Sequence, residues 1–455
     1  MKKGECFQLQ RVIGYFHGTI FLFSIIIGAG IFISPKGVLK YSLLNVGVSL
    51  IIWAACAMVS MMAALSHAEL GTTFPRSGAQ YYFLKRSLGP FIAFSYLWIN
   101  LFSVPAGVAA RGLLLAGYII QPFYSGCFVP EMPKKCLALA ILWCLGILNT
   151  RGAKEVTWFQ TVSTIVKMTV LCFISLTGII LLVRGRKENV ARFENALDAD
   201  IPDASQVAEA FLQGLYAFSG WEILVRIADA VAVTWMNRVI PSMQWAISIG
   251  VSASIFSSLN CSIFSTSRIF YVASQEGQLP LIFSTLNSRS CPAVAVIHIL
   301  IFASILIVPS DLILLINYVG FTAWIELGLM MIGLFKLRFQ EPNLPRPYKV
   351  RLPFAFGTLA MSLFLVLTPI IKSPKMYHIY VFLFILSGLL FYFPFVHFNL
   401  YSTYFNKITS FLQLLLNVSP ADNIDEYILA EGTLQKSPPE IAAKKTINFA
   451  YLASD

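Results

Sequence analysis

Residues 14–35 read GYFHGTIFLFSIIIGAGIFISP and contain no Asp, Glu, Lys or Arg. A helix that spans a bilayer needs about 20 predominantly apolar residues, and this run has that length. Two glycines, Gly28 and Gly30, interrupt its middle, which is tolerated at membrane depth only where protein surrounds the backbone. The run therefore predicts a spanning helix with a break near mid-membrane.

The glycine motif Ile27–Ile31 has two interpretations. An unwound helix frees backbone N–H and C=O groups, which discontinuous helices use to hold a substrate's carboxylate and ammonium. Alternatively, small residues let two helices pack closely. A second interrupted run, GLYAFSGW at 214–221, lies five predicted spans further along the chain. Two such runs together favour a transporter with inverted repeats.

The composition supports a membrane protein. Of the 455 residues, 57% are hydrophobic and only 12% are charged, whereas a soluble protein has roughly a quarter of its residues charged. The net charge of +11 comes from basic residues that lie between apolar runs, which argues against nucleic-acid binding. The Cys and His spacings fit no metal site, and no catalytic constellation is present. We therefore expect neither an enzyme nor a cofactor, and a channel or receptor lacks positive support.

Eleven spanning helices are expected from the apolar runs. They lie at 14–35, 44–70, 91–121, 136–149, 157–183, 206–228, 239–267, 292–308, 311–336, 353–372 and 377–399.

The basic residues expose an inconsistency in this count. Lys2, Lys3 and Arg11 precede the first span and place the N-terminus in the cytosol. The basic segment 336–351 should also be cytosolic, yet the number of preceding spans places it outside. Either a span is miscounted, or a helix is missing between residues 221 and 239.

Three long stretches carry a family resemblance. Residues 66–85 (SHAELGTTFPRSGAQYYFLK), 267–280 (SRIFYVASQEGQLP) and 337–350 (LRFQEPNLPRPYKV) resemble signatures of the light-chain (L-type) amino-acid transporters of solute carrier family 7, in the APC superfamily. The sequence PKKCLALA at 133–140 is similar to the corresponding sequence in the sodium-independent aspartate/glutamate branch of that family.

The resemblance implies an all-α polytopic fold of the LeuT/APC-like type, with an inverted five-plus-five repeat and two further helices. It implies a cytosolic N-terminus, a first repeat, a second repeat without its helix 7, two terminal helices and a cytosolic tail, at 1–13, 14–183, 206–336, 353–399 and 402–455. It further implies sodium-independent exchange of acidic amino acids or cystine at the plasma membrane, with both termini cytosolic.

The resemblance also implies which residues meet the substrate. The α-carboxylate and α-amino groups would contact the two interrupted helices, with Tyr216 at the position of a gating aromatic. These residues are Ile27, Gly28, Ala29, Gly30, Ile31, Tyr216, Phe218, Ser219 and Gly220. Lys167 matches a lysine that stands where sodium-coupled relatives bind their ion, and a buried ammonium can replace that charge. The alternative for Lys167 is that its side chain reaches an interface.

Cys127 lies in a polar loop, which is unusual among the cysteines of this chain. The resemblance implies that it forms a disulfide with a single-pass glycoprotein heavy chain, and the outer side of the membrane is oxidising. The alternative is a free loop thiol.

Arg111 lies inside the predicted span 91–121. A charged residue there is costly and normally faces a cavity or a partner. It can neutralise the side-chain carboxylate of an acidic substrate, or it can form a structural pair or reach the interface. The sequence leaves both interpretations open.

The chain departs from the family after Trp221. Residues 226–228 run directly into 229–235, where relatives continue through a further helix. The missing stretch of roughly 45 residues is long enough for a spanning helix and its flanking loops. It matches the helix that the charge pattern requires. The alternative function is therefore a non-transporting membrane subunit that binds the heavy chain.

Overall fold

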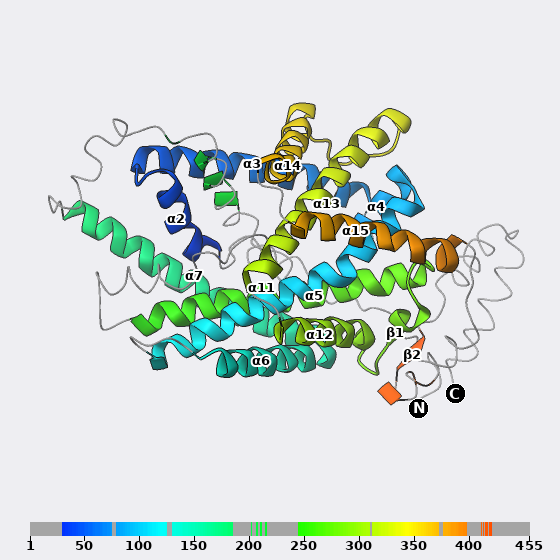
Figure 1. The fold of residues 1–455 in the computed structure, drawn as a ribbon, viewed down its shortest axis with the longest axis horizontal. Coiled ribbons are helices and arrows are strands. Elements are labelled where there is room, and N and C mark those ends of the chain that lie inside the picture. The colour runs from blue at the N-terminus through cyan, green and yellow to red at the C-terminus, as the bar shows by residue number, and fades with distance from the viewer. Residues whose placement is uncertain are drawn as a thin grey trace, which may run out of the picture.

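Helices make up nearly all of the described chain (Figure 1). The computed structural model describes residues 30–74, 79–124, 130–184, 244–309, 312–372 and 376–397, with short pieces between 202 and 215 and between 411 and 420. The helices are α2 (Gly30–Tyr41), α3 (Val46–Thr73), α4 (Ala79–Leu88), α5 (Pro90–Ile120), α6 (Glu131–Arg151), α7 (Ala153–Val183), α11 (Gln244–Gln275), α12 (Ala293–Ile307), α13 (Leu312–Gln340), α14 (Leu352–Lys372) and α15 (Met376–Phe391). Short helical turns at Gln121–Tyr124, Leu281–Ser284 and Tyr392–His397, and the two-residue strands β1 (Thr285–Leu286) and β2 (Ser419–Pro420), complete the elements.

Helix α5 is the centre of the packing. It contacts α4, α6, α11, α12, α13 and α15, and it crosses the middle of the molecule in Figure 1. Its small residues allow this because helices in membranes associate through close backbone approach. At Gly112, for example, an added Cβ would lie 3.3 Å from the side chain of Leu142 on α6.

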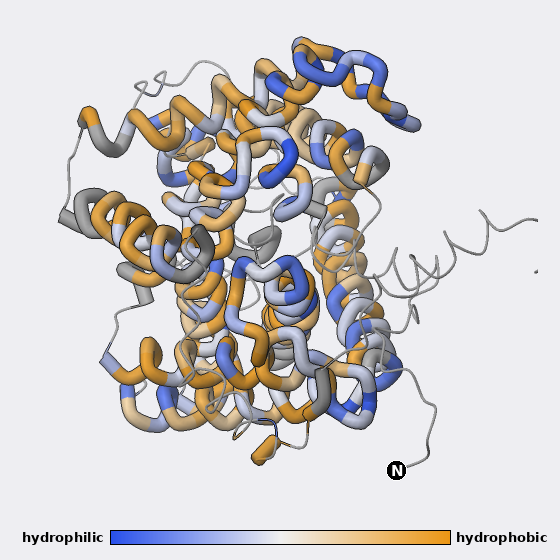
Figure 2. The backbone as a smooth tube through the Cα atoms, turned by 90° about the vertical axis from the view of Figure 1, so that its right-hand side faces the viewer, coloured by the Kyte–Doolittle hydropathy of each residue, from blue (hydrophilic) through white to orange (hydrophobic). Residues whose placement is uncertain are grey.

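Within the described residues, four helical stretches are long and apolar enough to cross a membrane. They are Val46–Leu70, Pro90–Tyr124, Lys154–Ile180 and Tyr318–Gln340, and they coincide with four of the expected spans. Shorter apolar helices lie at Ala293–Ile307, Leu352–Thr368 and Val381–Pro394. Orange, which marks hydrophobic residues, runs along the helices in Figure 2. The fold is thus helical and apolar as expected, while the total of eleven spans and the repeat remain predictions.

Two elements differ from the sequence expectation. The run 136–149 belongs to a longer helix, α6, because charged residues at its ends continue the helix without adding to the apolar run. Residues 79–88, expected only as a connection, form α4. Its residues Tyr81, Phe83 and Leu84 are fully buried, which gives this short helix a packed face.

Ion pairs gather at one end of the bundle and join α3, α4, α11 and α13. Lys85 of α4 pairs with Glu276, which directly follows α11, and Arg86 of α4 pairs with Glu341, which directly follows α13. The end of α3 joins the same group through a buried ion pair with α13. The segments around residues 85 and 341 therefore lie on the same side of the molecule.

This placement constrains the chain between α7 and α11. Helices α5, α6 and α7 follow one another from the ion-paired end, so α7 ends at the opposite end, at Val183. Helix α11 finishes beside Glu276 at the ion-paired end, so it begins at the opposite end, at Gln244. The connection 184–243 consequently starts and finishes on the same side.

Candidate functional site

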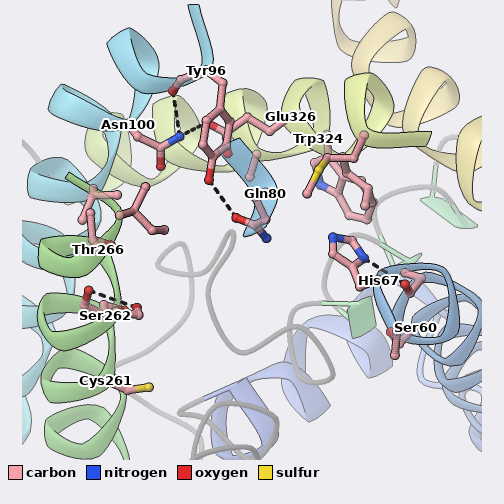
Figure 3. A pocket seen from close by; sticks show the side chains of 18 of the residues that line it. Ser60, His67, Gln80, Tyr96, Asn100, Cys261, Ser262, Thr266, Trp324 and Glu326 are labelled. Carbon is pink, nitrogen blue, oxygen red and sulfur yellow. Dashed lines mark hydrogen bonds between the residues drawn. The ribbon is translucent and has the colours of Figure 1, made fainter. Parts of the chain in front are cut away.

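A cavity of about 470 Å³ lies between α3, α4, α5, α11, α13 and α14. Hydroxyl, amide and apolar groups supply most of its wall, and a few ionisable side chains interrupt it (Figure 3). The polar and ionisable lining residues are Ser60, His67, Gln80, Tyr96, Asn100, Arg111, Ser258, Cys261, Ser262, Ser265, Thr266, Glu326 and Thr358. A concave, largely apolar site with a few convergent polar groups is the usual form of a small-molecule site.

Arg111 projects from α5 to the α11 wall of this cavity. Its Nη1 donates to the hydroxyl of Ser262 at 2.7 Å and to that of Ser258 at 3.1 Å, and its Nε donates to the carbonyl of Gly107 at 3.0 Å. A Cβ at residue 107 would lie 3.2 Å from Nη2, so glycine leaves room for the guanidinium. Arg111 therefore both lines the cavity and forms structural contacts, and its role as a substrate contact remains a prediction.

Glu326 of α13 belongs to a second set of polar side chains that line the same cavity (Figure 3). The side-chain amide of Asn100 donates to its Oε1 at 2.8 Å and to the backbone carbonyl of Tyr96 at 2.9 Å. The Tyr96 hydroxyl in turn donates to Oε1 of Gln80 at 2.7 Å. Residues of α4, α5 and α13 are thus linked by one hydrogen-bond chain along the cavity wall.

Lys167 lies fully buried in the middle of α7, near Cys261 of α11. Cys261 itself lines the cavity, which places Lys167 close behind the cavity wall. Nearby amides connect α6, α7 and α11, because Asn260 donates to Gln160 at 3.0 Å and accepts from Asn149 at 2.9 Å. The role of Lys167 in place of a sodium ion remains a prediction.

Most of the other predicted site residues lie outside the described residues. These are Ile27, Gly28, Ala29, Cys127, Tyr216, Phe218, Ser219 and Gly220. Gly30 and Ile31 are described as part of α2, and the rest of the predicted break lies outside the described residues. Leu215, next to Tyr216, lines the cavity.

The sequence analysis did not single out Glu326, Asn100, Gln80 or His67. A signal for Glu326 was present, because an acidic residue inside a predicted span is by default a candidate functional residue. The three others are ordinary in the sequence, and only the packing brings them to the cavity.

Comparison with known proteins decides the family. The pattern of the amino acid permease family matches residues 13–243 and 231–411. The chain belongs to the amino acid permease family. Mouse solute carrier family 7 member 13 is 50% identical, with 93% of this chain and 98% of the relative aligned. The human member 13 is 48% identical over 94% of this chain and all of the relative.

A more distant relative gives the same assignment. The human b(0,+)-type amino acid transporter 1 is 34% identical over 92% of this chain and 95% of its own length. The resemblance to solute carrier family 7 is therefore confirmed, and this permease is a membrane protein of an amino-acid transporter family.

The same comparisons bear on the missing segment. The alignment with the mouse relative has 469 positions, but only 93% of the 455 residues of this permease take part, so about 46 aligned positions have no residue here. The two matches to the family pattern meet at 231–243, just after the junction at residues 228–229. Relatives therefore carry a segment that this chain lacks, and the junction is the place where it is expected.

Proposed function

We propose that this permease is the light chain of a sodium-independent exchanger whose substrates are acidic amino acids or cystine. The observation that carries the proposal is the position of Arg111, whose guanidinium faces a cavity at membrane depth and is held by two serine hydroxyls. Charge-assisted bonds from arginine to a carboxylate are stronger than neutral ones and form in a fork geometry. A substrate carboxylate would replace the weaker serine contacts.

Sodium independence is part of the proposal. Lys167 is buried behind the cavity wall, where its ammonium would supply the charge that sodium supplies in coupled relatives. Uptake by the purified protein should then be equal with sodium or choline as the external cation.

Arg111→Gln tests the substrate class. We expect uptake of labelled aspartate into glutamate-loaded liposomes to fall roughly ten- to hundredfold, because a hydrogen bond to a charged group contributes about 1.5–3 kcal/mol. Arg111→Lys keeps the positive charge but loses the two parallel N–H donors of the guanidinium. Its aspartate uptake should lie between that of the wild type and that of Arg111→Gln. Ser265→Ala, another cavity position, is the control and should change uptake little. Unchanged aspartate uptake by Arg111→Gln would refute the assignment.

The heavy chain is proposed to attach through Cys127. A non-reducing gel of the co-expressed pair should show one disulfide-linked band that Cys127→Ser abolishes. Cys136→Ser is the matched control, because Cys136 is an exposed free cysteine close by in the sequence. Loss of the band in the control, or its persistence in Cys127→Ser, contradicts this attachment.

A second candidate is a non-transporting subunit that still binds the heavy chain. It is favoured by the missing segment of about 46 positions and by the connection 184–243, whose two ends lie on one side. Among the few described residues of this stretch, Ala210 and Leu215 are buried. An intact disulfide with weak or absent uptake supports the second candidate, whereas robust uptake supports the first.

Cysteine accessibility at residue 349 checks the arrangement that both candidates share. The ion pairs at the ends of α3, α4, α11 and α13 should be cytosolic. The cysteine of Lys349→Cys should therefore react with a membrane-impermeant thiol reagent only after the cell is permeabilised. Labelling of this variant from outside intact cells would refute the proposed orientation.

A further inference from the structure

Glu326 places a carboxyl group inside the apolar helix α13, within the candidate membrane span Tyr318–Gln340. It lies midway between Leu312 and Gln340, the ends of α13, which is roughly 21 Å from each at 1.5 Å per residue. Its side chain is partly exposed and is one of those that line the cavity (Figure 3). An ionisable group at this depth is costly and is retained where it has a function.

The contacts of Glu326 are neutral. Asn100 donates one hydrogen bond to its carboxyl group, and none of the ion pairs among the described residues includes it. The tyrosines Tyr96 of α5 and Tyr318 of α13 are its electrostatic neighbours.

The other elements packed around Glu326 bring few charges. His67 of α3 and Arg111 of α5 are the other ionisable groups of the cavity apart from Tyr96 and Cys261, whereas α4 contributes Gln80 and α14 contributes Thr358. The guanidinium of Arg111 is bound near Gly107, seven residues along α5 from Asn100, or roughly 10 Å. Among the described residues it forms no ion pair with Glu326.

A carboxylate among neutral groups in a low-dielectric site is unstable unless it gains a proton or a cation. We propose that Glu326 is a proton-binding residue of the substrate cavity, and that its proton keeps the cavity receptive to an anionic side chain. The proposal rests on the proposed function for its substrate class. When the proton leaves to bulk water, a negative charge remains in the cavity that Arg111 shares, and an acidic substrate is repelled.

The size of this effect follows from Coulomb's law. A unit charge at about 10 Å and an effective dielectric constant of about 20 changes affinity for an anion by roughly tenfold. A neutral amino acid carries no net charge, so its affinity should change much less over the same range of pH.

Infrared spectroscopy of the purified 455-residue protein tests the proton directly, without any need for transport. We expect the carbonyl stretch of a protonated carboxyl group near neutral pH, its loss as the pH rises, and its absence in Glu326→Gln. Glu341→Gln is the matched control, because Glu341 directly follows the same helix and forms an exposed ion pair with Arg86. Identical spectra for the wild type and Glu326→Gln overturn the proposal.

Binding of labelled aspartate tests the consequence. The affinity of the wild type should fall about tenfold as the band is lost, whereas Glu326→Gln should bind independently of pH because its amide is neutral like the protonated acid. If Glu326→Gln does not fold, the infrared spectrum of the wild type alone tests the proposal. A wild-type spectrum without a carboxylic-acid band that titrates overturns it. If aspartate does not bind at any pH but the band titrates, the substrate class fails and the proton site stands.

Discussion

Glu69 offers the sharpest test of how the bundle is held together at its ion-paired end. Its carboxylate, at the end of α3, is fully enclosed. Arg338 of α13 donates to both of its oxygens, from Nε at 3.0 Å and from Nη2, and the backbone N–H of Val350 donates to Oε2 at 2.8 Å. Arg346 adds a third cationic contact, with its Nε 3.6 Å from Oε1. One buried carboxylate thus ties α3 to α13 and to the segment 341–351.

Glu69→Gln keeps the size of the side chain and removes its charge. Arg338, with a side chain only 9% exposed, would then lose its paired carboxylate, and Arg346, only 5% exposed, would lose one of its two nearby carboxylates. The new amide nitrogen would also face N–H donors, since the atoms that contact Glu69 here are all donors. Breaking a buried pair in this way costs about 3–5 kcal/mol. We expect a loss of unfolding free energy of that order.

The matched control is Glu341→Gln at the same end of the bundle. Glu341 also accepts two bonds from one arginine, Arg86, at 3.0 and 2.6 Å, but this pair is exposed to solvent. Exposed pairs contribute little, so its loss should lie within the error of the measurement. Both variants are compared by reversible denaturation in mixed micelles with SDS. If Glu69→Gln is no less stable than Glu341→Gln, the burial argument is wrong.

Two further predictions concern packing and pH. At Gly146 of α6 an added Cβ would collide with the side chain of Leu300 on α12, so Gly146→Ala should cost about 1–3 kcal/mol in the same assay. The cost of Gly146→Ala should be smaller in a Leu300→Ala background, and an equal cost in both backgrounds would contradict the contact. The hydrogen bond from Arg86 holds the pKa of Glu341 below its usual value. A carboxyl group with a lowered pKa stabilises the folded state above its unfolded pKa and loses this effect as pH falls through its folded pKa. The small contribution of this pair is therefore present above the unfolded pKa and lost in acid, and Arg86→Gln should raise the pKa of Glu341 as followed by NMR. A pKa of Glu341 that is unchanged in Arg86→Gln would refute this.

The sequence predicted the spanning segments well because the bilayer imposes a length and a composition on them. The runs at 44–70, 91–121, 157–183 and 311–336 contain or overlap the long apolar helices of the structure. The sidedness of the basic residues indicated either a miscounted span or a missing helix, and the family resemblance placed a missing segment after Trp221; the comparisons show that relatives carry residues absent here.

Side-chain partners were less predictable. The sequence did not predict helix α4, because it is short and amphipathic and its buried face depends on neighbours far along the chain. Arg111 was identified as a cavity or pairing residue, but its serine partners on α11 are about 150 positions away and follow no local pattern.

By itself, therefore, the sequence determined that this chain is a helical membrane protein of an amino-acid transporter family. The length of an apolar run and the side of the membrane on which its flanking Lys and Arg lie are local properties that decide how a segment inserts in a bilayer. Only the tertiary structure decided that Arg111 and Glu326 share one cavity, and that Glu69 joins three segments at one end. The physical reason is that such contacts depend on how whole helices pack against one another, which no single stretch of the chain specifies.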